Sequence, residues 1–159
     1  MSTRGAIGFH FNDIDKIAYN HSGSYPECLG TSILYWLKDK TIDELKECCE
    51  NIVVLDDECN NIGFDKETGF AKEFEDYSSF LADSLFCEYA YIINLDTKKL
   101  EFYKGYNKNP NARGRYANKY AFENDKRYCG VALVKQIPLS KIFKGKIKVD
   151  EVGKTFIEV

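Results

Sequence analysis

The chain contains few of the residues on which metal and cofactor chemistry commonly depends. It has two histidines, His10 and His21, and these show neither the His-x-x-His nor the His-x-x-x-His spacing of metal sites. None of the six cysteines forms a Cys-x-x-Cys pair. We therefore expect no metal and no cofactor, and we expect reduced thiols, several of them buried among apolar residues.

Long apolar runs and an excess of positive charge are also missing. The longest apolar stretches are far too short to span a bilayer, and the first residues lack the apolar segment of a signal peptide. The net charge of −3 gives no general electrostatic reason to bind duplex nucleic acid or an anionic membrane. We expect a cytoplasmic protein without those two partners, while homo-oligomerisation stays open.

The residues that are present suit one folded domain. The chain of 159 residues is 44% hydrophobic and 14% aromatic, which is enough to form a substantial core. Residues 5–20 and 88–105 each have two apolar or alternating runs separated by turn residues, as in a β-hairpin. We predict a single α+β domain over residues 1–159, with an antiparallel sheet built from hairpins and two to three helices packed on one face.

Three stretches have the apolar periodicity of helices. The first follows Pro26 and places Leu29, Ile33, Trp36 and Leu37 on one face. The second begins at Thr41, where Thr41 and Glu44 have the spacing of a capping box, and it is expected to end near residues 56–58. The third covers roughly residues 71–86.

The last third of the chain predicts one buried strand and a short strand pair. Residues 128–135 form a nearly continuous apolar run, which is typical of a central strand. Pro138 should end it, and residues 139–143 are expected to form a helical turn. Residues 146–149 and 155–159 have short alternating patterns of strands at a sheet edge.

Residues 19–30, named here the opening loop, carry polar side chains between the first hairpin and the first helix. Ser24 and Glu27 have capping-box spacing, and Pro26 falls in the first turn, so we place a helix N-terminus here. Free amides at such an end and the flexible Gly23 would seat a phosphate or carboxylate. Cys28 is expected in the core of the first helical turn.

Residues 107–127, named here the long loop, have neither helical nor strand periodicity. A loop of this length inside a compact domain is usually functional or disordered. Its arginines and lysines alternate with tyrosines, and guanidinium groups bind phosphate while phenol rings stack on bases. The composition therefore suits a nucleotide, and a solvated loop is the alternative.

Two segments form a recognisable pattern. Residues 3–5 read Thr-Arg-Gly before the first hairpin, and residues 19–30 contain Tyr-Asn-His-x-x-Ser-Tyr-Pro-x-x-Leu-Gly. Together with the second hairpin, this pattern resembles a group of small proteins encoded mainly by phages and prophages. The resemblance implies a phage accessory protein made in the bacterial cytoplasm, where domains that bind nucleotide second messengers of bacterial immunity are a recurrent class.

We therefore expect a counter-defence protein that binds and sequesters a small anionic nucleotide, such as a cyclic nucleotide immune signal, without turnover. Its localisation would be the cytoplasm of an infected host. The candidate ligand-binding residues come from the start of the chain, the opening loop and the long loop: Arg4, Asn20, His21, Ser22, Ser24, Tyr25, Arg113, Arg115, Tyr116 and Lys119.

Two alternatives remain at this point. The protein could hydrolyse such a nucleotide, either with His21 as general base or with Ser2 as an N-terminal nucleophile after removal of Met1. It could instead inhibit a host enzyme through the acidic residues between positions 43 and 76. His10, in the middle of a strand, is interpreted as structural.

Overall fold

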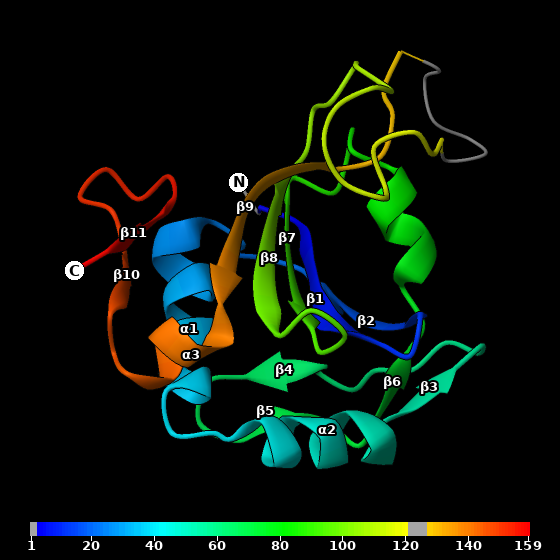
Figure 1. Cartoon of the computed structure of the whole chain (residues 1–159). Coiled ribbons are helices and arrows are strands. Elements are labelled where there is room, and N and C mark those ends of the chain that lie inside the picture. Colours follow the sequence, from blue (N-terminus) through cyan, green and yellow to red (C-terminus); the bar gives the residue numbers. More distant parts are fainter. Residues whose placement is uncertain (1–2, 121–126) are drawn as a thin grey trace.

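A five-stranded sheet in the order β2-β1-β7-β8-β9 forms the centre of the protein (Figure 1). The structure is a computed structural model that describes residues 3–120 and 127–159. The first hairpin consists of β1 (Gly5–Phe11) and β2 (Ile14–Asn20), and the second of β7 (Tyr89–Asn94) and β8 (Lys99–Lys104). Both predicted hairpins are confirmed, as is the single α+β domain with a mostly antiparallel sheet.

The two hairpins are joined by a parallel pairing of β1 with β7, which aligns Gly5 with Tyr89 and His10 with Asn94. The fifth strand, β9 (Ala132–Pro138), pairs antiparallel with β8 at the edge of the sheet. The predicted central position of this strand is wrong. The apolar run is buried mainly before the strand begins, at Cys129 and Val131.

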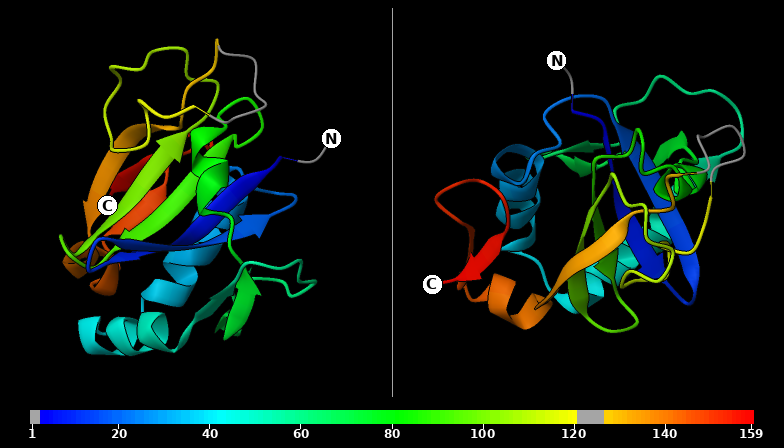
Figure 2. Two further views of the ribbon diagram at one scale, coloured as in Figure 1. Left: turned by 90° about the vertical axis from the view of Figure 1, so that its right-hand side faces the viewer. Right: turned by 90° about the horizontal axis from the view of Figure 1, so that it is seen from above.

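Three short helices cover one face of the sheet (Figure 2). A π-helical turn, η1 (Pro26–Gly30), leads into α1 (Thr31–Leu37), and α2 (Ile42–Asn51) and α3 (Leu139–Phe143) complete this layer. The predicted apolar face of the first helix is confirmed, as is the predicted turn at α3. The first core consists of sheet and helix side chains that include Phe9, Tyr91, Phe102, Ile33, Leu37, Leu45 and Ile142.

The second helix has the predicted beginning and an earlier end. The Thr41 hydroxyl accepts from the Glu44 amide at 3.2 Å, and the Glu44 carboxylate accepts from the Thr41 amide at 3.0 Å. The capping box is therefore confirmed. The helix ends at Asn51 rather than near residues 56–58, and the following residues form β3 (Val53–Leu55).

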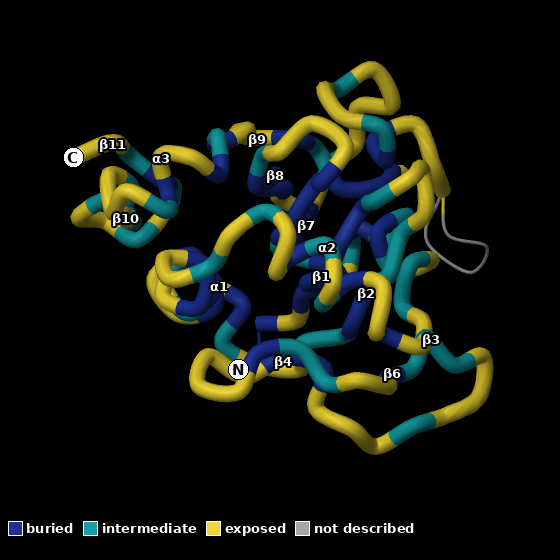
Figure 3. Tube along the Cα trace, turned by 60° about the horizontal axis from the view of Figure 1, so that its bottom comes forward, coloured by how far each residue is buried: buried dark blue, intermediate teal, exposed yellow. Residues whose placement is uncertain are grey.

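The opposite face of the sheet carries a second core of buried residues, which include Ala6, Ile17, Leu81, Ile92, Tyr103 and Tyr116. It is covered by a 3-10 helix, η2 (Ser78–Ala82), and by part of the long loop. Buried positions follow the central strands in Figure 3, because both faces of the sheet are covered there.

The predicted third helix over residues 71–86 is wrong. Residues Glu73–Glu75 form β6, which pairs in parallel with β3, and only η2 is helical. The physical reason is that Phe74 packs into the first core whereas Leu81 packs into the second. Two residues seven positions apart on one helix would share a face, so the chain must change conformation between them.

The remaining strands form two small hairpins that pack against the first core and are not hydrogen-bonded to the central sheet. β4 (Phe64–Asp65) pairs with β5 (Gly69–Phe70), and β10 (Ile147–Val149) pairs with β11 (Phe156–Glu158). The last pair confirms the strands predicted near the end of the chain. None of the described helices is long and apolar enough to cross a membrane.

Candidate functional site

The opening loop is held by its own side chains. The Asn20 side-chain amide donates to the Ser22 carbonyl at 2.9 Å and to the Ser24 hydroxyl at 2.7 Å. Ser24 is fully buried, and its carbonyl accepts from the Tyr91 hydroxyl at 2.8 Å. The predicted capping box at Ser24 is therefore wrong, because the Ser24 side chain bonds to Asn20 instead of capping η1.

Amide donors at the start of η1 are largely used within the chain. The Cys28 amide donates to the Tyr25 carbonyl at 2.9 Å, and the Leu29 amide donates to the Gly23 carbonyl at 3.1 Å. The five-residue η1 therefore leaves few of the donors that a helix-terminal anion seat requires. Cys28 itself is exposed, which corrects its predicted place in the core.

His21 and Ser22 are exposed polar residues of the opening loop, and they line cavities. The His21 ring nitrogen Nδ1 lies 2.9 Å from the Tyr19 hydroxyl. A cavity of about 350 Å³ lies between these residues and residues 59–62. A second cavity, of about 380 Å³, is also lined by Asn20 and Ser22, and its lining includes the oppositely charged Asp65 and Lys66.

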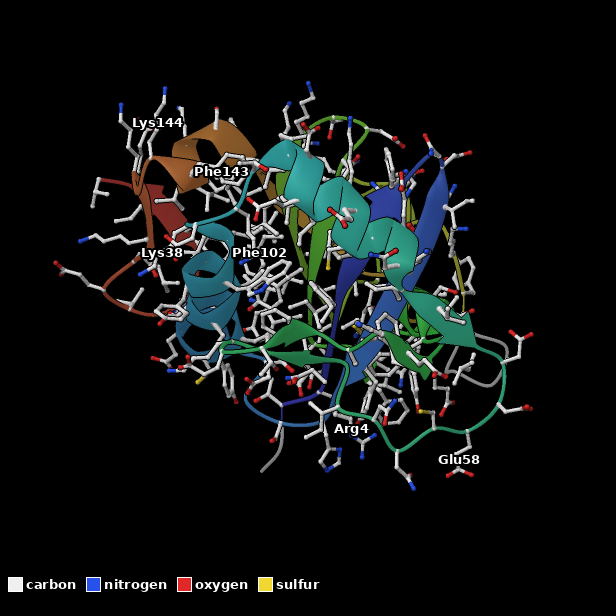
Figure 4. The ribbon with its side chains drawn as sticks, turned by 90° about the horizontal axis from the view of Figure 1, so that it is seen from below. Arg4, Lys38, Glu58, Phe102, Phe143 and Lys144 are labelled. Carbon is white, nitrogen blue, oxygen red and sulfur yellow. The ribbon has the colours of Figure 1, made fainter. Side chains whose placement is uncertain are left out.

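Exposed aromatic rings and two cations gather at the end of the sheet where β1 and β7 begin. We name this region the sheet-end surface and define it by Arg4, Tyr25, Phe86, Glu88, Tyr89, Tyr106, Lys108 and Tyr128. Tyr25 is 43% exposed, Phe86 47% and Tyr106 54%. Arg4 lies at the surface just before β1 (Figure 4).

Each cation of the sheet-end surface already contacts an aromatic face. The Arg4 guanidinium lies 5.6 Å from the centre of the Phe86 ring, and the Lys108 ammonium lies 5.2 Å from the centre of the Tyr128 ring. Such cation–π contacts hold a positive charge next to a stacking platform. Tyr25, just before η1, lies against Tyr89 at the start of β7, with ring centres 5.8 Å apart.

Glu88 organises the same surface. Its carboxylate accepts from the Arg4 amide at 3.3 Å and from the Tyr106 hydroxyl at 3.1 Å. Partial burial and this hydrogen bond to Glu88 raise the pKa of Tyr106, and Tyr25 adds to the shift. Tyr106 therefore remains a protonated hydrogen-bond donor at neutral pH.

One buried hydroxyl next to this surface lacks a partner. The Thr3 side chain is 1% exposed, and its Oγ1 makes no hydrogen bond to any of the residues that the structure describes. Buried polar atoms normally have a partner, because an unpaired hydroxyl loses its hydration without compensation. Thr3 immediately precedes Arg4 in the chain.

Two of the four long-loop candidates, Arg115 and Tyr116, bind acidic side chains of the sheet, and the other two are exposed to solvent. The Arg115 guanidinium contacts the Glu101 carboxylate at 2.8 Å, and the Tyr116 hydroxyl donates to the Asp15 carboxylate at 2.9 Å. Burial alone would lower the pKa of Arg115, but the hydrogen bond to Glu101 raises it overall. Arg115 and Tyr116 thus bind neighbouring side chains across the second face of the sheet.

The other two long-loop candidates, Arg113 and Lys119, are exposed. Residues 121–126 of the long loop lie outside the described residues. Of the ten candidates, the structure brings Arg4 and Tyr25 to the sheet-end surface, and it sets Asn20 opposite Gly5, next to Arg4 in the chain.

Sequence reasoning missed the acidic partners of this network. Glu101 is 5% exposed and also accepts from the Asn94 side chain at 3.1 Å and the Tyr103 hydroxyl at 2.9 Å. Burial raises the pKa of Tyr103, and Glu101 adds to the shift. The alternation of Glu101 with apolar neighbours suggests a solvent-facing position, and only the long loop packed on that face buries it.

His10 has a structural environment, as its place in a strand predicts. Its Nδ1 lies 2.6 Å from the Asp15 carboxylate, and its Nε2 lies 3.6 Å from Asp96 and 3.8 Å from Asp13. The ring therefore ties the turns of the two hairpins together. No three His, Cys, Asp or Glu residues in the described parts of the chain are arranged to hold a metal ion.

Comparison of the chain with protein-family models, with curated proteins and with solved structures found no match. Ser2, the nucleophile of one hydrolase alternative, lies outside the described residues. Function must therefore be argued from the chemistry of the sheet-end surface and the opening loop.

Proposed function

We propose that the protein binds a small anionic nucleotide at the sheet-end surface and holds it without turnover, as a phage-type counter-defence protein would sequester a cyclic nucleotide immune signal. The observation that carries this proposal is the grouping of exposed tyrosine and phenylalanine rings with Arg4 and Lys108. Base stacking on aromatic side chains and cation contacts to phosphate are the usual means of holding a nucleotide.

The base would stack on Tyr25 or Tyr106, because both rings are about half exposed and neither carries a cation on its face in the contacts described above. The phosphate would lie near Arg4, whose guanidinium lies over the Phe86 ring and has no side-chain hydrogen bond to any of the described residues.

The opening loop extends this site. Asn20 lines both cavities and pairs in the sheet with Gly5, the residue that follows Arg4. His21 and Ser22 offer polar groups there. A ligand with two phosphates would therefore reach groups in both regions.

Glu88 has a structural part in the proposed site. Its two oxygens accept from the Arg4 backbone amide and from the Tyr106 hydroxyl. Glu88 therefore holds the chain at Arg4 next to the Tyr106 ring, and both residues can then face the same ligand.

A release experiment separates the alternatives. The protein is incubated with a panel of cyclic di- and oligonucleotides and ADP-ribose derivatives, freed of unbound ligand, and denatured by heat. We expect one class of nucleotide to raise the Tm and to be recovered intact. Recovery of cleaved products that depends on His21 would instead identify a hydrolase, and a panel that shifts no Tm would contradict nucleotide binding and favour a protein partner.

A further inference from the structure

A groove on the side of the molecule formed by α1, α3 and β10 shares no lining residue with the sheet-end surface. Its volume is about 380 Å³, and its floor consists of Leu34, Ile142, Ile147 and Val149. These side chains come from α1 and from the last twenty residues of the chain, which pack against each other although they are distant in sequence. We name this feature the lysine-rimmed groove.

The rim of the groove is positive and aromatic. Lys38 and Lys148 line it and are exposed, and Tyr35 beside them is 46% exposed. The Tyr35 ring carries the Lys38 ammonium at 4.4 Å and the Lys66 ammonium at 5.8 Å. No acidic residue belongs to the lining of the groove within the described part of the chain. Figure 4 shows Lys38 and Lys144 on the same side of the molecule.

This local charge is opposite to that of the chain as a whole. The net charge is −3, and exposed acidic residues lie on the outer side of α2 at Asp43, Glu44, Glu47 and Glu50. Asp39, Asp150 and Glu151 are near the groove in sequence but do not belong to its lining. Lysines around an aliphatic floor favour a partner that has both acidic side chains, which pair with the lysines, and apolar side chains, which pack on the floor.

We propose that the lysine-rimmed groove binds an acidic amphipathic peptide segment of a partner protein. Apolar side chains of the segment would occupy the aliphatic floor, while its carboxylates would pair with Lys38 and Lys148. A nucleotide fits less well, because the aliphatic floor offers no donors or acceptors to the edges of a base. A membrane surface also fits less well, because the apolar residues are recessed between lysines rather than protruding.

Selection from a library of displayed random peptides tests this proposal directly. The wild-type protein is used as bait, and an enriched peptide is synthesised with a fluorescent label for anisotropy measurements. We expect the enriched peptides to combine Asp or Glu with Leu, Ile or Phe. We expect the double variant Lys38→Glu/Lys148→Glu to bind about tenfold more weakly, with a smaller dependence on salt.

Two controls keep the result specific. Lys72→Glu reverses an exposed charge outside the groove and should leave peptide affinity unchanged. Val149→Arg places a long charged side chain in the floor and should abolish binding while circular dichroism confirms a folded protein. Peptides without acidic residues, no enrichment at all, or equal affinity for wild type and the double variant would overturn the proposal. If wild type and Lys72→Glu bind anionic vesicles and the double variant Lys38→Glu/Lys148→Glu does not, the groove would be assigned to a membrane surface instead.

Discussion

Buried charge in this protein is concentrated in the pairing of Arg115 with Glu101. The long-loop composition identifies Arg115 and Tyr116 as candidates, but it cannot identify Glu101 and Asp15 as their partners. Contacts between residues 14 and 101 positions apart depend on how the sheet places the strands, and no local pattern records them. From the sequence alone, the guanidinium of Arg115 and the phenol of Tyr116 could bind a nucleotide or neighbouring side chains. The fold shows that they bind Glu101 and Asp15.

Removal of one partner from this pair should be costly. Arg115→Met leaves the Glu101 carboxylate, which is 5% exposed, with Asn94 and Tyr103 as its remaining partners among the described residues. We expect a loss of about 3 kcal/mol in the free energy of unfolding. This is at the lower end of the losses that follow removal of one partner of a buried ion pair, because Arg115 is partly exposed. The double variant Arg115→Met/Glu101→Gln should lose less than Arg115→Met alone. Urea unfolding of Arg115→Met, Glu101→Gln and the double variant measures these losses. A loss in the double variant equal to the sum of the two single losses would contradict a direct coupling between the two side chains.

Asp96 gives a pH-dependent effect of known sign. Its carboxylate accepts from the amides of Asn12 and Asp13 at 2.8 and 3.1 Å, and these hydrogen bonds lower the pKa of Asp96 below its ordinary value. A lowered folded-state pKa stabilises the protein above the ordinary carboxyl pKa, and this stabilisation is lost as the pH falls through the folded-state pKa.

We therefore expect Asp96→Asn to lower the urea midpoint at pH 7, and we expect this difference from wild type to be smaller at pH 3, which lies below the ordinary carboxyl pKa, so that part of the stabilisation is already lost. The effect should be small, because solvent screens this exposed group. Urea unfolding at the two pH values measures it. A difference between variant and wild type that grows on acidification would refute the assignment.

At the scale of elements, the same spacing of residues gave two different outcomes. Thr41 with Glu44 forms a capping box, whereas Ser24 with Glu27 does not. Thr41 precedes a regular helix of ten residues, while Ser24 is bonded to Asn20 before a π-helical turn. Hairpins and the first two helices were predictable because period and turn residues are local signals. The segment over residues 71–86 was not, because its apolar residues serve two different cores.

The capping box at α2 should contribute measurably to stability. Thr41→Ala removes the acceptor for the Glu44 amide, and we expect a loss of about 1 kcal/mol in the free energy of unfolding. Thr97→Ala, at an exposed position of the turn between β7 and β8, serves as the matched control. Urea unfolding compares the two variants, and equal small losses would show that the cap is not used.

At the scale of the whole molecule, the parallel pairing of β1 with β7 decides where the candidate site lies. It places the start of both strands at one end of the sheet, and so brings Arg4, Glu88 and Tyr89 together. The sequence suggested Arg4 and Tyr25 from the resemblance and from the opening loop. It gave no signal for Phe86, Glu88 or Tyr106, because they join the site only through the pairing of distant strands.

The affinity of the sheet-end surface for a nucleotide tests the central claim most directly. Isothermal titration would use the panel nucleotide that gives the largest Tm shift, with wild type, Arg4→Gln and Tyr25→Ala. Tyr35→Ala, at a tyrosine 46% exposed compared with 43% for Tyr25, is the matched control. We expect each site variant to weaken binding about tenfold or more, and the control to bind as wild type. Wild-type affinity in both site variants would contradict the proposed site, and no measurable binding of any nucleotide to the wild type would contradict the proposed function.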